Sequence, residues 1–346
     1  MRDLIIFIPS IESGGVEKNL FYITNYIQYK FKNIYLITAN KNKKYPIGKN
    51  VKLITPRSKS YDDRNRFIKS IICSYLLFKN FKNKKTLVLS FQSNFFSILV
   101  SKLINAKIVI RLNTAPDKYI SNFFKKFFFK FLYNLADKII VNSSEFKENL
   151  YNHFNLKSKV IYNPKKKKKT KKKINYFKNF SGLKIISIGR LTDQKDHMTL
   201  LKALNLLKNN FNFKFRLYLI GKGYMNETLS NYILNNGLQK NVKLAGYKKN
   251  AFQYIKSSNL FILSSKYEGL PNTLIEAQVA QVPIISSNCP TGPKEILKNG
   301  KLGDLFIVGD YKNLSKKIYN FYKNNKVLKK KSKLAEKYLN RFNYQK

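Results

Sequence analysis

The chain has 346 residues and a hydrophobic fraction of 44%, which suits two globular domains and argues against disorder. Its 67 basic and 18 acidic residues give a formal net charge of +49, which would favour contact with nucleic acid or an anionic membrane. The lysines are spread along the whole chain, and Trp is absent while Lys, Asn, Ile, Phe and Tyr are abundant. Codon bias therefore explains most of the excess charge.

Short runs rich in Val, Ile and Leu alternate with longer helical patterns. The predicted strands of the first half are residues 4–9, 34–38, 51–54, 86–90, 107–111 and 138–142, and those of the second half are residues 183–188, 216–220, 242–244, 260–264 and 283–286. Nearly continuous apolar strands separated by helices predict buried parallel sheets. The sequence therefore predicts an α/β protein with two Rossmann-like, doubly wound domains that face a cleft. Ligands would bind in that cleft between the domains, at the carboxyl ends of the strands.

The boundary between the two domains is marked by charge. Eight lysines occupy the nine positions after Pro164, and such a run of like charges resists packing. We predict an N-terminal domain at residues 1–163, a lysine-rich linker at 164–180, a C-terminal domain at 181–328 and a helical tail at 329–346.

Targeting signals and cysteine usage indicate the compartment. Cys73 and Cys289 lie far apart and match no metal or redox spacing, which indicates a reducing cytoplasm. No span reaches the roughly 20 apolar residues of a transmembrane helix, and the apolar run at residues 4–8 is too short for a signal peptide. We expect a cytoplasmic protein held peripherally at the inner face of the cytoplasmic membrane by its positive charge.

Two turns between a predicted strand and a predicted helix carry candidate chemistry. The first is Gly189-Arg190-Leu-Thr-Asp-Gln-Lys195, which is followed by Asp196 as a cap for a helix starting near His197. Fixed cations at such a turn would stabilise the charge of a departing diphosphate. With 67 basic residues in the chain, two solvated cations are the alternative interpretation.

The second turn is Glu268-Gly-Leu-Pro-Asn-Thr-Leu-Ile-Glu276, in which Gly269 and Pro271 shape a tight loop before a helix. The amides near Asn272–Leu274 would face an anion at the start of that helix. Thr273 and Glu276 also match a capping box, so Glu276 could simply satisfy the helix start.

Together the two turns resemble glycosyltransferase family 4, the retaining enzymes of GT-B architecture. The resemblance implies transfer of a hexose or N-acetylhexosamine from a nucleotide sugar, expected to be a UDP-sugar, onto a lipid-linked or cell-surface glycan in polysaccharide or lipopolysaccharide biosynthesis. It implies front-face attack, with the leaving phosphate accepting the proton of the acceptor. The catalytic residues would be Arg190, Lys195 and Glu268. The donor-binding residues would be Gly14, Gly15, Gly189, Gly269, Leu270, Pro271, Asn272, Thr273, Leu274 and Glu276.

One departure from the family concerns a histidine that many members place after a strand of the N-terminal domain. The matching region here contains Arg111 and Asn113 instead, and these two residues are the acceptor-side candidates. The two histidines of the chain, His153 and His197, are expected to be structural or solvated. A non-catalytic scaffold that binds nucleotide sugars is an alternative that this departure supports.

Metal and dinucleotide motifs are incomplete. Asp62-Asp63 lacks Asp-x-Asp spacing, so we expect no metal and no cofactor. Gly221-Lys-Gly223 begins a dinucleotide fingerprint, but Asn226 replaces its third glycine, which disfavours a dehydrogenase. A sugar-nucleotide epimerase would lack a reason for the aromatic and basic helix at residues 123–133.

That helix carries Phe124, Phe127, Phe128 and Phe131 on one face, as membrane-interface helices do. The alternative is that the stripe lies in the core of the domain. A polyanion-binding protein is the alternative that the charge suggests, but the sequence contains no recognisable nucleic-acid module, so we expect no specific nucleic acid.

Overall fold

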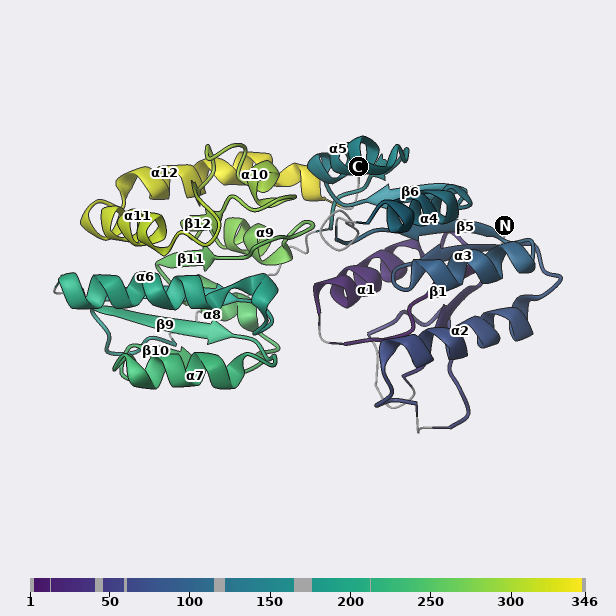
Figure 1. The fold of residues 1–346 in the computed structure, drawn as a ribbon, viewed down its shortest axis with the longest axis horizontal. Helices are drawn as coiled ribbons and strands as arrows, with labels where there is room; N and C mark the ends of the chain where they lie inside the picture. The colour runs from purple at the N-terminus through teal and green to yellow at the C-terminus, as the bar shows by residue number, and fades with distance from the viewer. Residues whose placement is uncertain are drawn as a thin grey trace. The chain divides into compact units, whose positions relative to one another are not determined.

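The computed structural model describes residues 3–12, 14–40, 46–58, 61–114, 122–164, 176–211 and 213–343. The chain divides into two compact units, Met1–Pro164 and Lys165–Lys346, and each is described here by itself (Figure 1). Residues 165–175, which include the whole lysine run of the predicted linker, lie outside the described residues.

The first unit contains one parallel sheet in the order β3-β2-β1-β4-β5-β6-β7. Its strands are β1 (Asp3–Phe7), β2 (Ile34–Ile37), β3 (Val51–Ile54), β4 (Thr86–Ser90), β5 (Lys107–Arg111), β6 (Lys138–Val141) and β7 (Lys159–Val160). Its helices are α1 (Gly15–Ile27), α2 (Arg66–Phe81), α3 (Asn94–Leu103), α4 (Phe123–Asn134) and α5 (Ser144–Phe154).

Helices cover both faces of this sheet because its strands are apolar on both sides. Ile5 and Phe7 of β1 belong to the core that α2, α3, α4 and α5 complete. Leu4 and Ile6, which point the opposite way in a strand, belong to a second core with Leu20 of α1. The predicted buried parallel sheet is therefore confirmed for this unit.

The second unit contains another parallel sheet, in the order β10-β9-β8-β11-β12-β13. Its strands are β8 (Leu183–Ile188), β9 (Phe215–Ile220), β10 (Val242–Leu244), β11 (Leu260–Leu263), β12 (Ile284–Ser287) and β13 (Asp304–Phe306). Its helices are η2 (Asp193–Lys195), α6 (His197–Asn210), α7 (Asn226–Asn235), α8 (Ala251–Ser257), α9 (Asn272–Val279), α10 (Pro293–Ile296), α11 (Tyr311–Lys323), α12 (Lys326–Ala335) and η3 (Glu336–Phe342).

The end of the chain packs onto this second unit. Arg341, in η3, donates hydrogen bonds from its guanidinium to the carbonyl oxygens of Glu295 and Ile296, over 3.1 and 2.7 Å. Leu328 of α12 lies in the main core of the unit. The predicted helical tail therefore begins at Lys326 and forms part of this unit.

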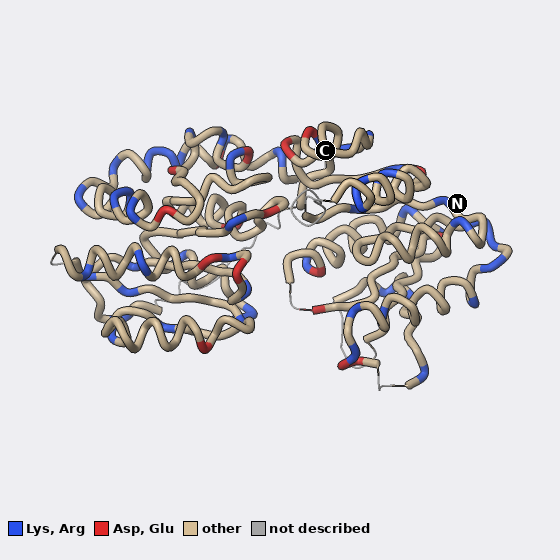
Figure 2. The backbone as a smooth tube through the Cα atoms, viewed as in Figure 1, with Lys and Arg blue, Asp and Glu red and all other residues tan. Residues whose placement is uncertain are grey.

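Basic residues are distributed over the helices of both units, as Figure 2 shows. None of the helices within the described ranges is both long enough and apolar enough to cross a bilayer.

Candidate functional site

Each sheet reverses its strand order at one point, and open α/β sheets bind ligands at such a switch point beyond the carboxyl ends of the strands. In the second unit, β8 is the starting strand and lies between β9 and β11. In the first unit, β1 lies between β2 and β4. The predicted Gly189–Lys195 turn follows β8 and the Glu268 turn follows β11, so both lie at the switch point of the second unit.

The turn after β8 is short and positions Lys195 at the end of the 3₁₀ turn η2. Asp196 adopts a left-handed conformation, with φ of 43°, and caps α6 by accepting from the Thr199 amide over 3.3 Å and from the Thr199 hydroxyl over 2.7 Å. The predicted cap is confirmed. A Cβ on Gly189 would lie 3.1 Å from Cδ of Lys195, so the glycine leaves room for the lysine chain to pass.

Lys195 and Glu268 form an ion pair between Nζ and Oε1. Their side chains are 15% and 7% exposed, and the Ser265 hydroxyl donates to the same carboxylate oxygen over 2.6 Å. Ser264, which follows β11, donates from its hydroxyl to the carbonyl oxygen of Lys195 over 3.0 Å. The two predicted catalytic residues, 73 positions apart, are thus joined directly at the switch point.

The loop after β12 is hydrogen-bonded to the turn that carries Glu268. The Thr291 hydroxyl donates to the carbonyl oxygen of Glu268, and the Glu268 amide donates to the carbonyl oxygen of Pro290 over 3.2 Å. Gly292 has φ of +93°, and a Cβ there would lie 2.2 Å from the carbonyl oxygen of Gly269. This position therefore requires glycine both for its conformation and for the close approach of the two backbones.

Arg190 lies at the rim of the same turn. Its side chain is exposed and donates to Gln194 Oε1 over 3.1 Å, while Gln194 in turn donates to the carbonyl oxygen of Tyr267 over 3.0 Å. The Gln194 side chain therefore links the arginine to the turn that carries Glu268. An exposed guanidinium held by one amide is available to a dianionic ligand.

Helix α9 begins at Asn272, with Pro271 as its N-cap. Thr273 therefore lies inside the helix, and the predicted capping box with Glu276 is not formed. Glu276 lies in the second turn of α9 and is half-buried. Gly269, Leu270 and Pro271 are buried, Asn272 and Thr273 are half-buried, and Leu274 is buried. The Leu274 amide donates to the carbonyl oxygen of Pro271 over 3.1 Å, so this amide is already paired.

The pair Gly221 and Gly223 has a packing role. A Cβ on Gly221 would lie 1.8 Å from the carbonyl oxygen of Gly189, and a Cβ on Gly223 would lie 2.1 Å from that of Leu191. The two glycines let the loop after β9 lie directly against the turn that carries Arg190. This contact accounts for both glycines without a dinucleotide site.

His197 is buried at the start of α6, which agrees with a structural role. Burial, together with the positive charge of Lys195, lowers its pKa to about 4, although the backbone of Arg190 and Gly189 acts in the opposite direction. Between pH 6.5 and 4 the unfolded histidine binds a proton and the folded one does not. The free energy of unfolding therefore decreases as pH falls through this window.

We expect this histidine to contribute on the order of 3 kcal/mol to the loss of stability between pH 6.5 and pH 4. His197→Gln removes the titrating group and should flatten that part of the curve. Urea unfolding at closely spaced pH values measures the free energy of unfolding of both proteins. The reference is pH 8, where the histidine of the wild type is neutral in the folded and the unfolded state. If the free energy of unfolding depends on pH in the same way for the two proteins from pH 8 to pH 4, His197 is not the source of the loss of stability.

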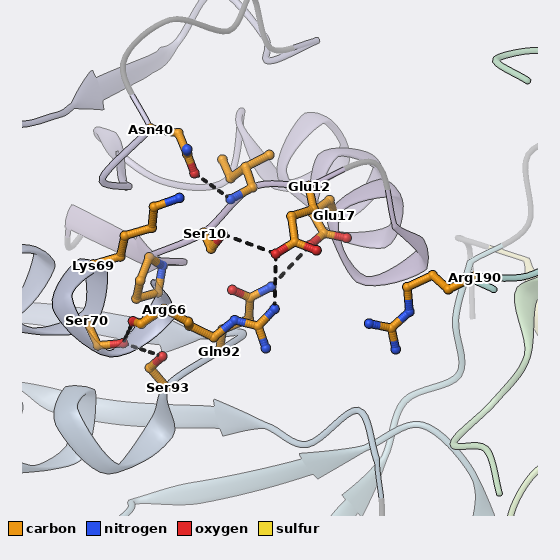
Figure 3. Close-up of polar contacts among 12 residues, drawn as sticks. Ser10, Glu12, Glu17, Asn40, Arg66, Lys69, Ser70, Gln92, Ser93 and Arg190 are labelled. Atoms are coloured by element: carbon orange, nitrogen blue, oxygen red, sulfur yellow. Dashed lines mark hydrogen bonds and ion pairs between the residues drawn. The ribbon is translucent and has the colours of Figure 1, made fainter. Parts of the chain in front are cut away.

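A second polar cluster lies at the switch point of the first unit, where β1 and β4 end (Figure 3). Arg66, the first residue of α2, donates to Glu12 Oε1 over 3.3 Å, and Ser10 donates to the same oxygen over 3.4 Å. Gln92 donates to Glu17 Oε1 over 3.1 Å. Burial raises the pKa of the Glu17 carboxyl. The cluster combines carboxylates with an exposed cation, which suits binding of hydroxyl groups.

The predicted glycines Gly14 and Gly15 border this cluster. Gly14 is the N-cap of α1 and Gly15 is its first residue. A Cβ on Gly14 would lie 2.5 Å from Oε2 of Glu17, so only glycine leaves the carboxylate in its place. The glycine turn therefore shapes the cluster around Glu17.

The acceptor-side candidates Arg111 and Asn113 both bind neighbouring groups of the same unit. Arg111 is buried and donates to the Ile161 carbonyl oxygen over 3.1 Å and to Asn163 Oδ1 over 2.9 Å. Burial lowers its pKa to about 10. Asn113 donates to the carbonyl oxygen of Phe91 over 3.0 Å. Their contacts hold the ends of β4, β5 and β7 together.

The glutamates of the first unit were missed by sequence reasoning. Glu12 and Arg66 are 54 positions apart, and Gln92 and Glu17 are 75 positions apart. The available signal was the scarcity of acidic residues, only 18 in the chain, of which two follow the first strand directly.

The family model for glycosyl transferases group 1 matches residues 163–338, about half of the chain. The chain belongs to the group 1 glycosyl transferases. The matched region contains the elements of the second unit from β8 to α12, including the Lys195–Glu268 pair.

Curated relatives of this group 1 glycosyl transferase include an uncharacterised glycosyltransferase of Methanocaldococcus jannaschii, 34% identical over 220 residues. That alignment covers 58% of this chain and 53% of the relative, so the chain spans about half the length of that protein. Another relative is the N-acetylgalactosamine-N,N'-diacetylbacillosaminyl-diphospho-undecaprenol 4-alpha-N-acetylgalactosaminyltransferase of Campylobacter jejuni. It is 26% identical over 344 residues, which cover 95% of this chain and 92% of that one.

Among solved structures, HepE of Anabaena in complex with UDP and glucose superposes with a TM-score of 0.82. The two chains are 17% identical, and the superposition covers 99% of this chain and 96% of HepE. This likeness concerns the fold. Two parallel α/β units of the kind found in GT-B glycosyltransferases confirm the predicted fold class.

Proposed function

We propose that this group 1 glycosyl transferase moves a hexose or an N-acetylhexosamine from a UDP-sugar to a lipid-linked or cell-surface glycan, with retention of configuration. The observation that carries the proposal is the Lys195–Glu268 pair at the switch point of the second sheet. A sugar diphosphate presents anionic oxygens beside hydroxyl groups. A cation held against a carboxylate matches both kinds of group in one place.

The roles of the residues follow from their positions. Arg190 and Lys195 would hold the diphosphate, Arg190 from the exposed rim and Lys195 from the base of the turn. Glu268 would accept hydrogen bonds from the sugar, and Glu276 on α9 would accept them from the ribose. The backbone of residues 269–274 lies between these two carboxylates, where the diphosphate would pass.

Support for the donor and the acceptor comes from two similar proteins. HepE is in complex with UDP and glucose, and we extend UDP to the present chain as the expected nucleotide. The Campylobacter relative is named for a diphospho-undecaprenol acceptor, and its alignment covers nearly the whole chain. A lipid-linked acceptor requires an enzyme that reaches the membrane surface, so we place this protein peripherally on the inner face of the cytoplasmic membrane.

Transfer without a metal or cofactor is part of the proposal. The two cations of the turn after β8 would balance the charge that develops on the leaving diphosphate, which is the role of a divalent ion in other transferases.

Calorimetric titration with UDP, GDP and ADP in the presence of EDTA tests the proposal. We expect micromolar binding of UDP, and we expect Arg190→Ala to weaken it by about 1.5–3 kcal/mol, the range for hydrogen bonds to charged groups. Lys202→Ala is the matched control, because this exposed lysine of α6 removes one positive charge from the same unit.

Equal weakening by both variants would mean that the net charge, and not the site, attracts the nucleotide. Absence of binding to all three nucleotides by a folded protein would overturn the proposal. In that case a scaffold or a polyanion-binding protein becomes the better interpretation, which salt-dependent binding to DNA or heparin would distinguish.

A further inference from the structure

Helices α2, α3 and α4 lie side by side on one face of the first sheet. Helix α3 contacts both α2 and α4, and Figure 1 shows the three helices in that order. Their inner faces contribute Leu77, Ile98 and Phe129 to the core of the unit. Three neighbouring helices that share one core present a common outer surface.

That outer surface is apolar, and we call it the aromatic face. Its exposed residues follow helical spacing on each element, so each helix contributes one stripe. They are Phe67, Ile71, Tyr75 and Phe78 on α2, Phe95, Leu99 and Leu103 on α3, and Phe123, Phe124, Phe127, Phe128 and Phe131 on α4. Phe124 and Leu103 are 79% and 75% exposed.

Ring contacts make the aromatic face continuous from one helix to the next. The ring centroids of Phe67 and Phe96 are 5.5 Å apart, and those of Phe96 and Phe95 are 5.2 Å apart. The ring centroids of Phe95 and Phe128 are 6.0 Å apart. A soluble monomer rarely exposes a contiguous apolar patch that spans three helices, and such patches mark interaction sites.

The charge around the aromatic face indicates which kind of partner would bind there. The three helices carry Lys or Arg at seven positions and no Asp or Glu. Lys125, Lys126 and Lys130 lie among the phenylalanines of α4. Three others of the seven are compensated or buried, because Arg66 and Lys102 pair with Glu12 and Asp137 and Lys69 is buried. A second copy of this chain would still bring the lysines of α4 against each other, which opposes self-association. An anionic bilayer offers both negative charge and an apolar interior.

We propose that the aromatic face is a membrane-docking surface, through which α2, α3 and α4 insert phenylalanine side chains into the headgroup region of an anionic bilayer. The purpose of this contact, access to a lipid-linked acceptor, rests on the proposed function. Docking itself depends only on the outer face of the first unit, whereas the nucleotide test concerns the second unit.

The absence of tryptophan from the chain allows a direct test. Phe127→Trp introduces a single indole on α4, within the aromatic face. With vesicles of phosphatidylcholine and phosphatidylglycerol, and no nucleotide, we expect its emission to shift to the blue and to be quenched by brominated acyl chains. Tyr29→Trp is the matched control, because Tyr29 is 74% exposed and follows α1, which covers the opposite face of the sheet. Its emission should stay unchanged.

A binding measurement completes the test. The double substitution Phe124→Ser with Phe127→Ser should lower partitioning into these vesicles about tenfold or more, because the apolar contribution to interfacial binding is lost. Both side chains are exposed, so the fold should persist, and UDP binding should be unaffected.

Two results would overturn the proposal. Sedimentation of the Phe127→Trp variant with vesicles, but without a blue shift of its indole emission, would mean that the net charge alone attracts the lipid. A dimer in ultracentrifugation that the double serine substitution dissociates would assign the aromatic face to a second copy of the chain. Loss of UDP binding with intact docking would instead reject only the proposed function.

Discussion

Lys195→Met is expected to destabilise the protein by about 3–5 kcal/mol, because it leaves the buried carboxylate of Glu268 without its cation. The methionine fills most of the volume of the lysine stem, so the cost comes from the unpaired charge and not from a cavity. Ser265 keeps its hydrogen bond to the carboxylate and offsets part of the loss. Urea unfolding followed by circular dichroism measures the change.

The chain contains a matched control for this prediction. Lys331 and Asp304 form an ion pair of 2.6 Å in the same unit, but their side chains are 29% and 28% exposed. Lys331→Met should therefore cost about 1 kcal/mol or less. Combining Lys195→Met with Glu268→Gln removes both charges and should restore most of the stability. Equal costs for the two lysine substitutions, or strict additivity in the double variant, would show that burial does not strengthen the Lys195–Glu268 pair.

Most of the fold could be predicted because the strands are continuous runs of Val, Ile and Leu. The predicted bounds of β3, β4, β5, β8 and β10 agree with the structure. Two edge strands, β7 and β13, were missed. They have two and three residues, which is too short to show the apolar pattern of a strand in the sequence. Their pairing is imposed by the neighbouring strands β6 and β12.

The candidate site was predictable as a set of residues and not as a set of contacts. Motif spacing identified Lys195 and Glu268, but their ion pair joins strand ends that only the order of β8 and β11 brings together. The capping box failed because Pro271, and not Thr273, is the N-cap of α9, so the helix begins two residues earlier than the box requires. The role of Gly292 depends on a backbone approach to Gly269, which has no signature in a single sequence.

The helix at residues 123–133 shows how burial decides between two interpretations of one pattern. The stripe of Phe124, Phe127, Phe128 and Phe131 could have lain in the core. Instead, Phe129 and Leu132 are the buried residues of α4, and the stripe is exposed. The core interpretation is therefore wrong for these four phenylalanines.

Glu268→Gln is expected to lower sugar transfer far more than nucleotide binding. The glutamine keeps the size of the side chain but cannot hold Lys195 by charge or accept hydrogen bonds from sugar hydroxyls at both oxygens. Removing one preorganised electrostatic contact of a transition state costs about 100- to 1,000-fold in rate. Release of UDP from UDP-sugars, with and without a glycan acceptor, measures this loss.

The separation of rate from affinity distinguishes a site role from a structural one. UDP has no transferred sugar, so its affinity for Glu268→Gln should stay within about twofold of wild type if the carboxylate acts on the sugar. Ser265→Ala removes a hydrogen bond to the same carboxylate and should cost the rate less, because the charge remains. A parallel fall of rate and UDP affinity in both variants would mean that Glu268 only supports the shape of the turn. A loss of rate without a loss of UDP affinity would mean that Glu268 acts on the transferred sugar. The cation of Lys195 would then lie close to the bond between the sugar and the diphosphate, which breaks in the reaction.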